Sequence, residues 1–232
     1  MGTVAWKKYR TVNPSVPVPE RLAVDVQKAI ETDPATNTVD IGSPVFLRIT
    51  KTSDDSDHGQ IEAFLQNDQG RYVPFKSWDI CTWSGELGPK YKEGDKQSPE
   101  GFYSVKTENL NPNSRFHLSF DLGFPNEFDR SKGRTGSFLM VHGECSSIGC
   151  YAMGNPGIEE IYSLVFEALE NGQESVSVHA FPFPMTEENL ATNADNRHIE
   201  FWRNLKQGWD AFEETGTPPK VSVVDGNYSF SP

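Results

Sequence analysis

A histidine and a cysteine stand eight residues apart near the middle of the chain, at His142 and Cys150. A cysteine thiol attacks a carbonyl carbon when a nearby imidazole takes its proton. Ser147 and Gly149 lie just before the cysteine, and in such small turns backbone N–H groups can approach a substrate oxygen. The segment therefore predicts acyl transfer, with Cys150 as the nucleophile, His142 as the base, and Ser147 and Gly149 shaping an oxyanion turn.

The imidazole needs a partner that holds one tautomer, because only the nitrogen without a proton can act as a base. No Asp or Glu stands out for that role, so a backbone carbonyl near His142 is the alternative. Free cysteine has a pKa of about 8.5, and an ion pair with the histidine would stabilise the thiolate near neutral pH. We therefore expect Cys150 and His142 to meet in one cleft.

Other uses of these residues stay open on the sequence alone. Cys150 could be a buried structural thiol and His142 a hydrogen-bonded histidine at a strand end. A zinc site would take His142, Cys145 and Cys150 with His117 or His179, although the spacing is not that of a usual zinc ribbon. A Cys145–Cys150 disulfide would silence the nucleophile, but we expect Cys145 to pack as a small apolar residue.

Short β-favouring runs separated by Gly, Asp and Ser clusters predict a β-rich core. The expected strands are 45–49, 61–65, 72–75, 102–105, 116–120, 137–142 and 176–181. The strand 137–142 ends at His142, and we expect it to place the motif in the cleft. Residues Ser84–Gly101 are rich in Gly, Lys, Glu and Pro, and we expect a long loop that overhangs this cleft.

Helical periodicity appears on both sides of this core. A short helix is expected over Pro19–Glu31, and a second begins after the motif with Asn155 as its N-cap and presents one apolar face. Residues 186–215 are expected to be helical, with an aromatic stripe that includes Trp202 and Trp209. The fold class is therefore α+β and β-rich, divided into a lead-in (1–41), a catalytic domain (42–185) and a helical C-terminal extension (186–232).

Composition excludes several classes of protein. The formal net charge is -12 and no Lys/Arg cluster is present, which argues against a nucleic-acid partner. The longest apolar runs are only a few residues, far short of the roughly 20 that span a bilayer. No apolar signal-peptide segment is visible in residues 1–10. No metal and no cofactor are expected for the cysteine chemistry.

The motifs resemble those of a known family. His-Gly followed by Ser-x-Gly-Cys, at 142–150, is similar to the signature of the YkuD-type L,D-transpeptidases of bacterial cell walls, and Gly-Cys-Tyr-Ala-Met at 149–153 resembles their YafK-like branch. Further similar segments are Leu87–Lys90, Glu93–Asp95, Ser98–Tyr103, Asn111–Phe120, Gly123–Asn126, Val178–Phe183 and Phe201–Gly208. The resemblance covers roughly residues 40–230.

The resemblance implies a fold, a reaction and a place. Cys150 would attack the carbonyl of meso-diaminopimelate in a peptidoglycan stem peptide, His142 would be the base, and the Gly143 carbonyl would orient it. An amine or water would then resolve the thioester, which gives a transpeptidase or a hydrolase. In the YafK-like branch the implied hydrolysis cuts the link to an outer-membrane lipoprotein. The implied location is the periplasm or cell envelope.

One departure concerns substrate binding. The wider family often has an Arg two residues after the cysteine, where this chain has Ala152. Arg115, Lys90 and Tyr151 are the candidate substrate-binding residues in its place. Two other functions stay open: a peptidoglycan-binding module that kept the fold without catalysis, and a secreted toxin that applies the same chemistry to a competitor's wall.

Overall fold

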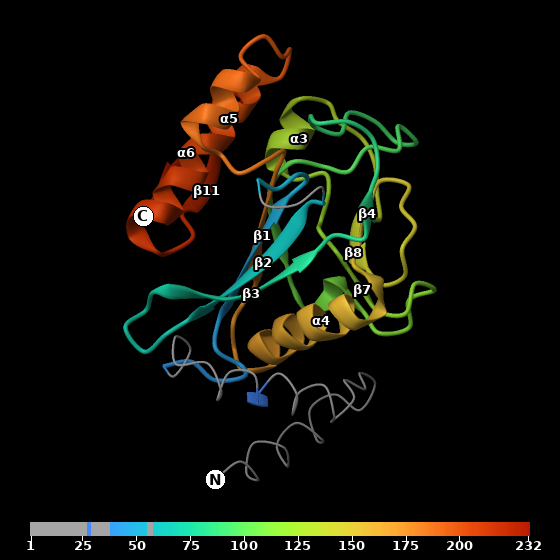
Figure 1. Cartoon of the computed structure of the whole chain (residues 1–232), viewed down its shortest axis with the longest axis vertical. Helices are drawn as coiled ribbons and strands as arrows, with labels where there is room; N and C mark the ends of the chain where they lie inside the picture. The colour runs from blue at the N-terminus through green and yellow to red at the C-terminus, as the bar shows by residue number, and fades with distance from the viewer. Residues whose placement is uncertain (1–26, 29–37, 55–57) are drawn as a thin grey trace.

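The computed structural model describes residues 27–28, 38–54 and 58–232, and within them two five-stranded sheets dominate a mixed α+β protein (Figure 1). The predicted β-rich α+β class is confirmed. The helix expected over Pro19–Glu31 lies outside the described residues, apart from 27–28. The division of the chain at 41/42 and 185/186 stays a prediction.

The first sheet has the strand order β3-β2-β1-β10-β5. Its strands are β1 (Val45–Thr50), β2 (Gln60–Gln66), β3 (Tyr72–Asp79), β5 (Gly101–Val105) and β10 (Val176–Phe181). Only the central pair, β1 and β10, runs parallel, and the other neighbours are antiparallel. All of these strands were predicted from their β-favouring runs.

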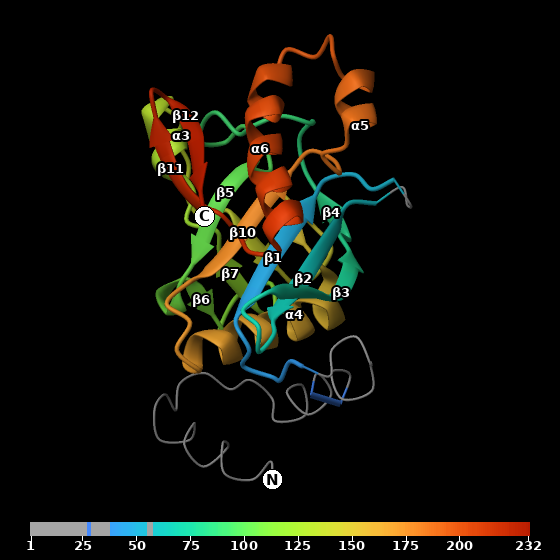
Figure 2. The ribbon, with the colours of Figure 1, turned by 90° about the vertical axis from the view of Figure 1, so that its left-hand side faces the viewer.

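Helices cover both faces of this sheet. On one face, helix α4 (Gly154–Glu170) contributes its predicted apolar stripe, including Ile158, Ile161 and Val165, to the main core. On the other face, Phe212 of helix α6 (Ile199–Thr215) packs against Phe46 and Phe64 of β1 and β2. Figure 2 shows α6 crossing the sheet on the side opposite to α4. The sheet is therefore rigidly held between two layers, which is why every residue of β1 is buried.

The second sheet has the strand order β4-β9-β8-β7-β6 and contains the residues on either side of the His142–Cys150 loop. Its strands are short: β4 (Thr82–Trp83), β6 (Leu110–Asn111), β7 (Ser119–Asp121), β8 (Met140–His142) and β9 (Tyr151–Ala152). Two of them begin later than the sequence predicted. His117 has φ 72° and Phe138 has φ 55°, and a residue in this left-handed region cannot continue a strand.

Helix α4 also starts differently from the prediction. Its N-cap is Met153, and Asn155 lies inside the first turn. The Asn155 carboxamide instead accepts a hydrogen bond from the Glu144 N–H at 2.8 Å. The expected capping residue therefore fixes the loop that follows His142, rather than its own helix.

The predicted helical segment 186–215 is divided into α5 (Glu187–Thr192) and α6, and a hairpin that was not predicted follows it. The hairpin consists of β11 (Lys220–Val224) and β12 (Asn227–Ser231). The remaining short helices are α3 (Glu127–Ser131) and the 3-10 helix η2 (Thr107–Asn109). Among the described residues, no helix has both the length and the apolar character that a membrane crossing needs.

Candidate active site

Strand register brings the two ends of the motif together. β8 and β9 are parallel neighbours, with His142 paired to Ala152 and Val141 to Tyr151. Cys150 comes immediately before β9, so it lies beside β8. The pairing of these two strands therefore places the histidine and the cysteine on adjacent strands of one sheet.

The His142 imidazole is fixed by the residue that follows it. Its Nδ1 lies 2.6 Å from the carbonyl oxygen of Gly143, and since a carbonyl can only accept, Nδ1 carries the proton. The ring is almost completely buried and packs on the Phe116 ring with 4.6 Å between centroids. Burial lowers the pKa of His142, despite the opposing hydrogen bond to Gly143 and the charge of Glu144. The result is a neutral imidazole whose Nε2 lone pair is free to take a proton.

The Cys150 thiol is held by the backbone of the neighbouring strand. Its Sγ accepts a hydrogen bond from the Met140 N–H at 3.4 Å and donates to the Phe138 carbonyl at 3.7 Å. Burial raises the pKa of Cys150, so the group is a thiol at neutral pH. Cys150 is the only one of the three cysteines that is free.

The expected ion pair between these two residues is absent from the structure. Within the described part of the chain, no hydrogen bond joins the Cys150 thiol to the His142 imidazole, and both groups are in their neutral forms. The physical reason is desolvation, which penalises the charged form of each partner, while backbone groups satisfy each neutral form. If Cys150 is a nucleophile, as the sequence predicts, its proton has to be transferred as it attacks.

Serine hydroxyl oxygens accept hydrogen bonds from the backbone N–H groups of the turn that precedes Cys150. Ser147 Oγ accepts from the N–H groups of Gly149 at 3.2 Å and Cys150 at 3.0 Å, and it donates to the Cys150 carbonyl at 2.7 Å. Gly149 has φ 117°, and a Cβ there would lie 3.1 Å from Leu139 Cδ1, so the position requires glycine. The amides predicted as oxyanion donors thus point at serine oxygens, which a substrate oxyanion would have to replace.

Two further serines hold this turn, and sequence reasoning did not single them out. Ser84 Oγ accepts from Gly149 N–H at 2.6 Å, and Ser98 Oγ donates to the Cys150 carbonyl at 2.8 Å. The two are joined, since Ser84 N–H donates to Ser98 Oγ at 3.1 Å. They stand at the start and near the end of the predicted loop, which contains no helix or strand over residues 84–100 and ends where Gly101 begins β5. Through these hydrogen bonds the loop fixes the turn that precedes Cys150.

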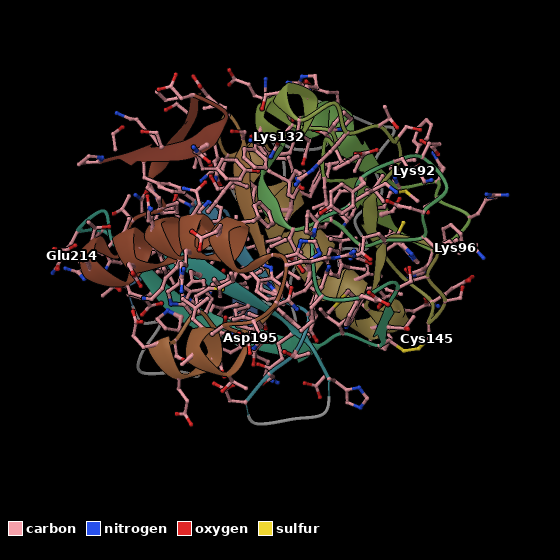
Figure 3. All side chains as sticks on the ribbon, turned by 90° about the horizontal axis from the view of Figure 1, so that it is seen from above. Lys92, Lys96, Lys132, Cys145, Asp195 and Glu214 are labelled. Carbon is pink, nitrogen blue, oxygen red and sulfur yellow. A yellow bond between two sulfur atoms is a disulfide. The ribbon has the colours of Figure 1, made fainter. Side chains whose placement is uncertain are left out.

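A disulfide joins Cys81 to Cys145, with their Cα atoms 5.4 Å apart. The expectation that Cys145 packs as a small apolar residue is wrong, because both half-cystines are exposed. Figure 3 shows Cys145 with its yellow sulfur at the outer edge of the molecule. The bond ties the turn between β3 and β4 to the loop between His142 and Cys150, and it removes Cys145 as a partner for Cys150.

The zinc alternative loses one of its ligands for the same reason. A disulfide sulfur has no thiolate to offer a metal. His117 contacts Glu159 Oε1 at 2.6 Å, and His179 is fully buried among the rings of Phe46, Phe102 and Phe181. Across the described ranges, no group of three or more His, Cys, Asp or Glu side chains is placed to hold a metal ion.

Sequence comparison gives the family. Over 191 residues the chain is 45% identical to the protein of Escherichia coli K12 named "Putative L,D-transpeptidase YafK", which covers 82% of this chain and 75% of that protein. The YafK protein of strain O157:H7 matches to the same extent. The chain belongs to the L,D-transpeptidase family. Its place in the YafK branch, predicted from the motif, is confirmed, and membership supports a peptidoglycan-related enzyme role in the cell envelope.

Two other comparisons are more distant. The helical cell shape determining protein Pgp2 from Campylobacter jejuni is 18% identical at a TM-score of 0.44, covering 78% of this chain and 74% of that one. Bd1075 of Bdellovibrio bacteriovorus is 14% identical at a TM-score of 0.39, covering 74% of this chain and 57% of that one. No protein-family model matches the chain.

The three predicted substrate-binding residues of this L,D-transpeptidase differ in accessibility. Tyr151 is fully buried and its hydroxyl donates to the Pro99 carbonyl at 2.7 Å, so it packs and does not face a substrate. Lys90 is also buried and pairs with Asp95, although its charge acts to lower the pKa of Cys150. Arg115 alone is exposed, and its guanidinium lies 5.8 Å from the Phe116 ring that packs on His142.

The sequence reasoning missed a carboxylate near Cys150. Asp121 ends β7 and is paired with Met140, whose N–H contacts the Cys150 sulfur. The Asp121 charge raises the pKa of the thiol, and burial raises the pKa of Asp121 itself. On the same face Ser119 pairs with His142, and its buried hydroxyl has no hydrogen-bond partner among the described residues. Only strand register reveals these two neighbours, because they lie about 20 to 30 residues before the motif.

Proposed function

We propose that this L,D-transpeptidase is a cysteine acyltransferase that acts on peptidoglycan stem peptides at the meso-diaminopimelate carbonyl. The observation that supports the proposal most strongly is the 2.6 Å contact between His142 Nδ1 and the Gly143 carbonyl. It leaves Nε2 unprotonated, on the strand next to the chain's one free cysteine. A base of fixed tautomer beside a free thiol is the arrangement that acyl transfer requires.

The proposed reaction has two halves. In the first, the Cys150 thiol gives its proton to His142 Nε2 as the sulfur attacks the substrate carbonyl. The carbon–nitrogen bond then breaks, the amine leaves with the proton from His142, and a thioester remains on Cys150. In the second half, a neutral amine or water attacks the thioester carbon and gives a proton to His142. The carbon–sulfur bond then breaks, and His142 returns the proton to sulfur, which regenerates the thiol.

The resting contacts of the thiol support a role for substrate in assembling the site. The Cys150 S–H donates to the Phe138 carbonyl, and this bond must break before the proton can reach His142. Catalytic hydrogen bonds are often long or misaligned until substrate binds, so the resting arrangement is compatible with the reaction. Phe138 is 75% exposed beside the nucleophile, in a left-handed conformation that is strained for a bulky residue.

The disulfide supports a location outside the cytoplasm. Disulfides persist in oxidising compartments such as the bacterial periplasm and are rare where thiols are kept reduced. The Cys81–Cys145 bond is exposed on both sides, so it depends on such a compartment. This agrees with a cell-envelope enzyme whose substrate is the cell wall, including stem peptides that carry an outer-membrane lipoprotein.

The test is to incubate the purified chain, and its Cys150→Ala variant, with lipoprotein-bearing sacculi and to identify the products by liquid chromatography and mass spectrometry. New 3-3 cross-links or exchanged terminal D-amino acids would establish a transpeptidase. Released lipoprotein peptide with free tripeptide stems would establish a hydrolase. In either case the products must disappear with Cys150→Ala, while circular dichroism shows an unchanged fold.

Two results would contradict the proposal. If the wild-type chain binds sacculi saturably but gives no Cys150-dependent product, the fold serves as a binding module. If the wild-type products persist in Cys150→Ala, the nucleophile is another group. The observation against the binding module is that the only free cysteine and a correctly oriented imidazole are both retained.

A further inference from the structure

Asp121 occupies a defined position relative to the nucleophile. In the antiparallel pair of β7 and β8, Asp121 stands opposite Met140. The Met140 N–H in turn contacts the Cys150 sulfur, so one strand separates Asp121 from Cys150. Side chains alternate along a strand, so Asp121 and Ser119 share one face of the sheet with Met140 and His142. A substrate held between His142 and Cys150 on this face therefore comes within reach of the Asp121 carboxylate.

The Asp121 carboxylate has no cationic partner in the described residues. Its Oδ1 accepts from the Gly123 N–H at 2.7 Å, and no ion pair involves it. Several other buried or half-buried carboxylates are paired with cations: Asp129 with Arg134, Glu100 with Lys51, Asp95 with Lys90, and Glu62 with Arg48. Glu167 of helix α4 shares the lack of a cationic partner among the described residues. Asp121 is thus a half-buried carboxylate near Cys150 whose charge no cation among the described residues balances through an ion pair.

An unbalanced charge of this kind is costly to bury, and it persists where a ligand supplies the opposite charge. The bond to Gly123 does not explain the charge, because the carboxamide oxygen of Asn would accept from the same N–H. The proposed reaction supplies suitable cations. Its acceptor is an amine, and meso-diaminopimelate carries a second, side-chain amine, and both are protonated near neutral pH.

We propose that Asp121 binds a protonated primary amine of the peptide substrate, and so selects ammonium-bearing stem peptides at the Cys150 site. This inference deepens the proposed function and rests on it for the identity of the substrate. The ammonium has two possible sources, the side chain of the donor's meso-diaminopimelate and the attacking acceptor. The charge-assisted bond to Asp121 is the same for both, but an acceptor ammonium must first give a proton to His142, because only the neutral amine can attack.

The first experiment measures binding without turnover, so that it does not depend on catalysis. Isothermal titration calorimetry compares a tetrapeptide stem whose side-chain amine is free with the same peptide acetylated at that amine, using full-length Cys150→Ala protein. We expect the free-amine peptide to bind at least about tenfold more tightly, since a charge-assisted hydrogen bond is lost on acetylation. The added Asp121→Asn change should abolish the difference, while Glu108→Gln, on the exposed 3-10 helix η2, should preserve it.

Equal affinities for the two peptides, or no binding of either, would overturn the proposal for the donor amine. The acceptor is tested with wild-type Cys150 by steady-state kinetics against a D-amino acid. There Asp121→Asn should raise the KM of whichever substrate carries the bound ammonium about tenfold, with kcat little changed. A KM unchanged for both substrates in a turning-over enzyme, together with equal calorimetric affinities, rejects Asp121 as the ammonium site.

The two proposals fail in different ways. An inactive wild-type chain that still prefers the free-amine peptide through Asp121 would remove the acyl-transfer function and keep the binding site. A Cys150-dependent enzyme indifferent to the amine would do the reverse. Thermal melting of Asp121→Asn excludes a folding defect, and the substitution keeps the size of the side chain and its bond to Gly123.

Discussion

The indole Nε1 of Trp202 donates a hydrogen bond to Oε2 of Glu100 at 2.8 Å, which joins helix α6 to the loop beside Cys150. The other oxygen of Glu100 lies 2.9 Å from Lys51 Nζ, and both side chains of this ion pair are fully buried. Lys51 also donates to the Gly88 carbonyl at 3.0 Å. The C-terminal helix and the first sheet therefore meet at one buried carboxylate, which anchors the loop that contains Ser84 and Ser98.

Lys51→Met should destabilise the protein by about 3–5 kcal/mol, because it leaves the Glu100 carboxylate buried without a counter-charge. Urea unfolding followed by circular dichroism measures the change. The double variant Lys51→Met, Glu100→Gln should recover part of the loss, since the remaining group is neutral. If Lys51→Met has the stability of the wild type, Glu100 is not ionised in the folded protein.

His142→Gln should lower kcat/KM by roughly 10²- to 10⁴-fold, the usual contribution of general acid–base catalysis. Glutamine can still donate to the Gly143 carbonyl but cannot take a proton, so the change removes the base and keeps the bond. The matched control is His117→Gln, since that imidazole is exposed and contacts Glu159. Near-normal turnover by His142→Gln would exclude this imidazole from the mechanism.

The pH dependence of Cys150 alkylation reports whether a resting ion pair exists. Iodoacetamide reacts with the thiolate, and burial raises the pKa of Cys150, so the rate should climb with pH and reach its midpoint above about 8.5. Asp121→Asn should move the midpoint to lower pH, because the Asp121 charge contributes to the raised pKa. A rate that is already at its plateau between pH 5 and 7 would instead indicate a thiolate paired with protonated His142.

Local sequence signals predicted the parts of the fold that depend on short-range chemistry. β-favouring runs located β1 and β10, and apolar stripes located α4 and α6. The hairpin at the C-terminus was missed although a signal exists. Asp225 and Gly226 both have positive φ, and an Asp-Gly pair between alternating residues is typical of a two-residue hairpin turn.

The features that sequence reasoning could not supply depend on distant pairings. The partner of Cys145 lies 64 residues away, and three cysteines allow three pairings that spacing cannot separate. Asp121 comes near Cys150 only through the register of three strands. Neutral Cys150 and His142 follow from burial, which the motif does not encode.

Removal of the disulfide should destabilise the protein and loosen the site. The paired residues are 64 apart in sequence, and on the chain-entropy estimate closure of a loop of that length contributes roughly 4 kcal/mol. The double variant Cys81→Ser, Cys145→Ser should unfold at correspondingly lower urea concentration. It is a better probe than a reductant, because Cys150 stays untouched as the only remaining cysteine.

The same variant separates the structural role of the disulfide from catalysis. Cys145 lies in the loop between His142 and Cys150, so its release should lower kcat/KM more than a distant change of similar stability cost, such as Phe212→Ala in the cluster with Phe46 and Phe64. A thiol titration of the unfolded wild type should count one free thiol before reduction and three after it. Three free thiols in protein made in an oxidising compartment would mean that the Cys81–Cys145 disulfide does not form. The disulfide would then give no support to an envelope location.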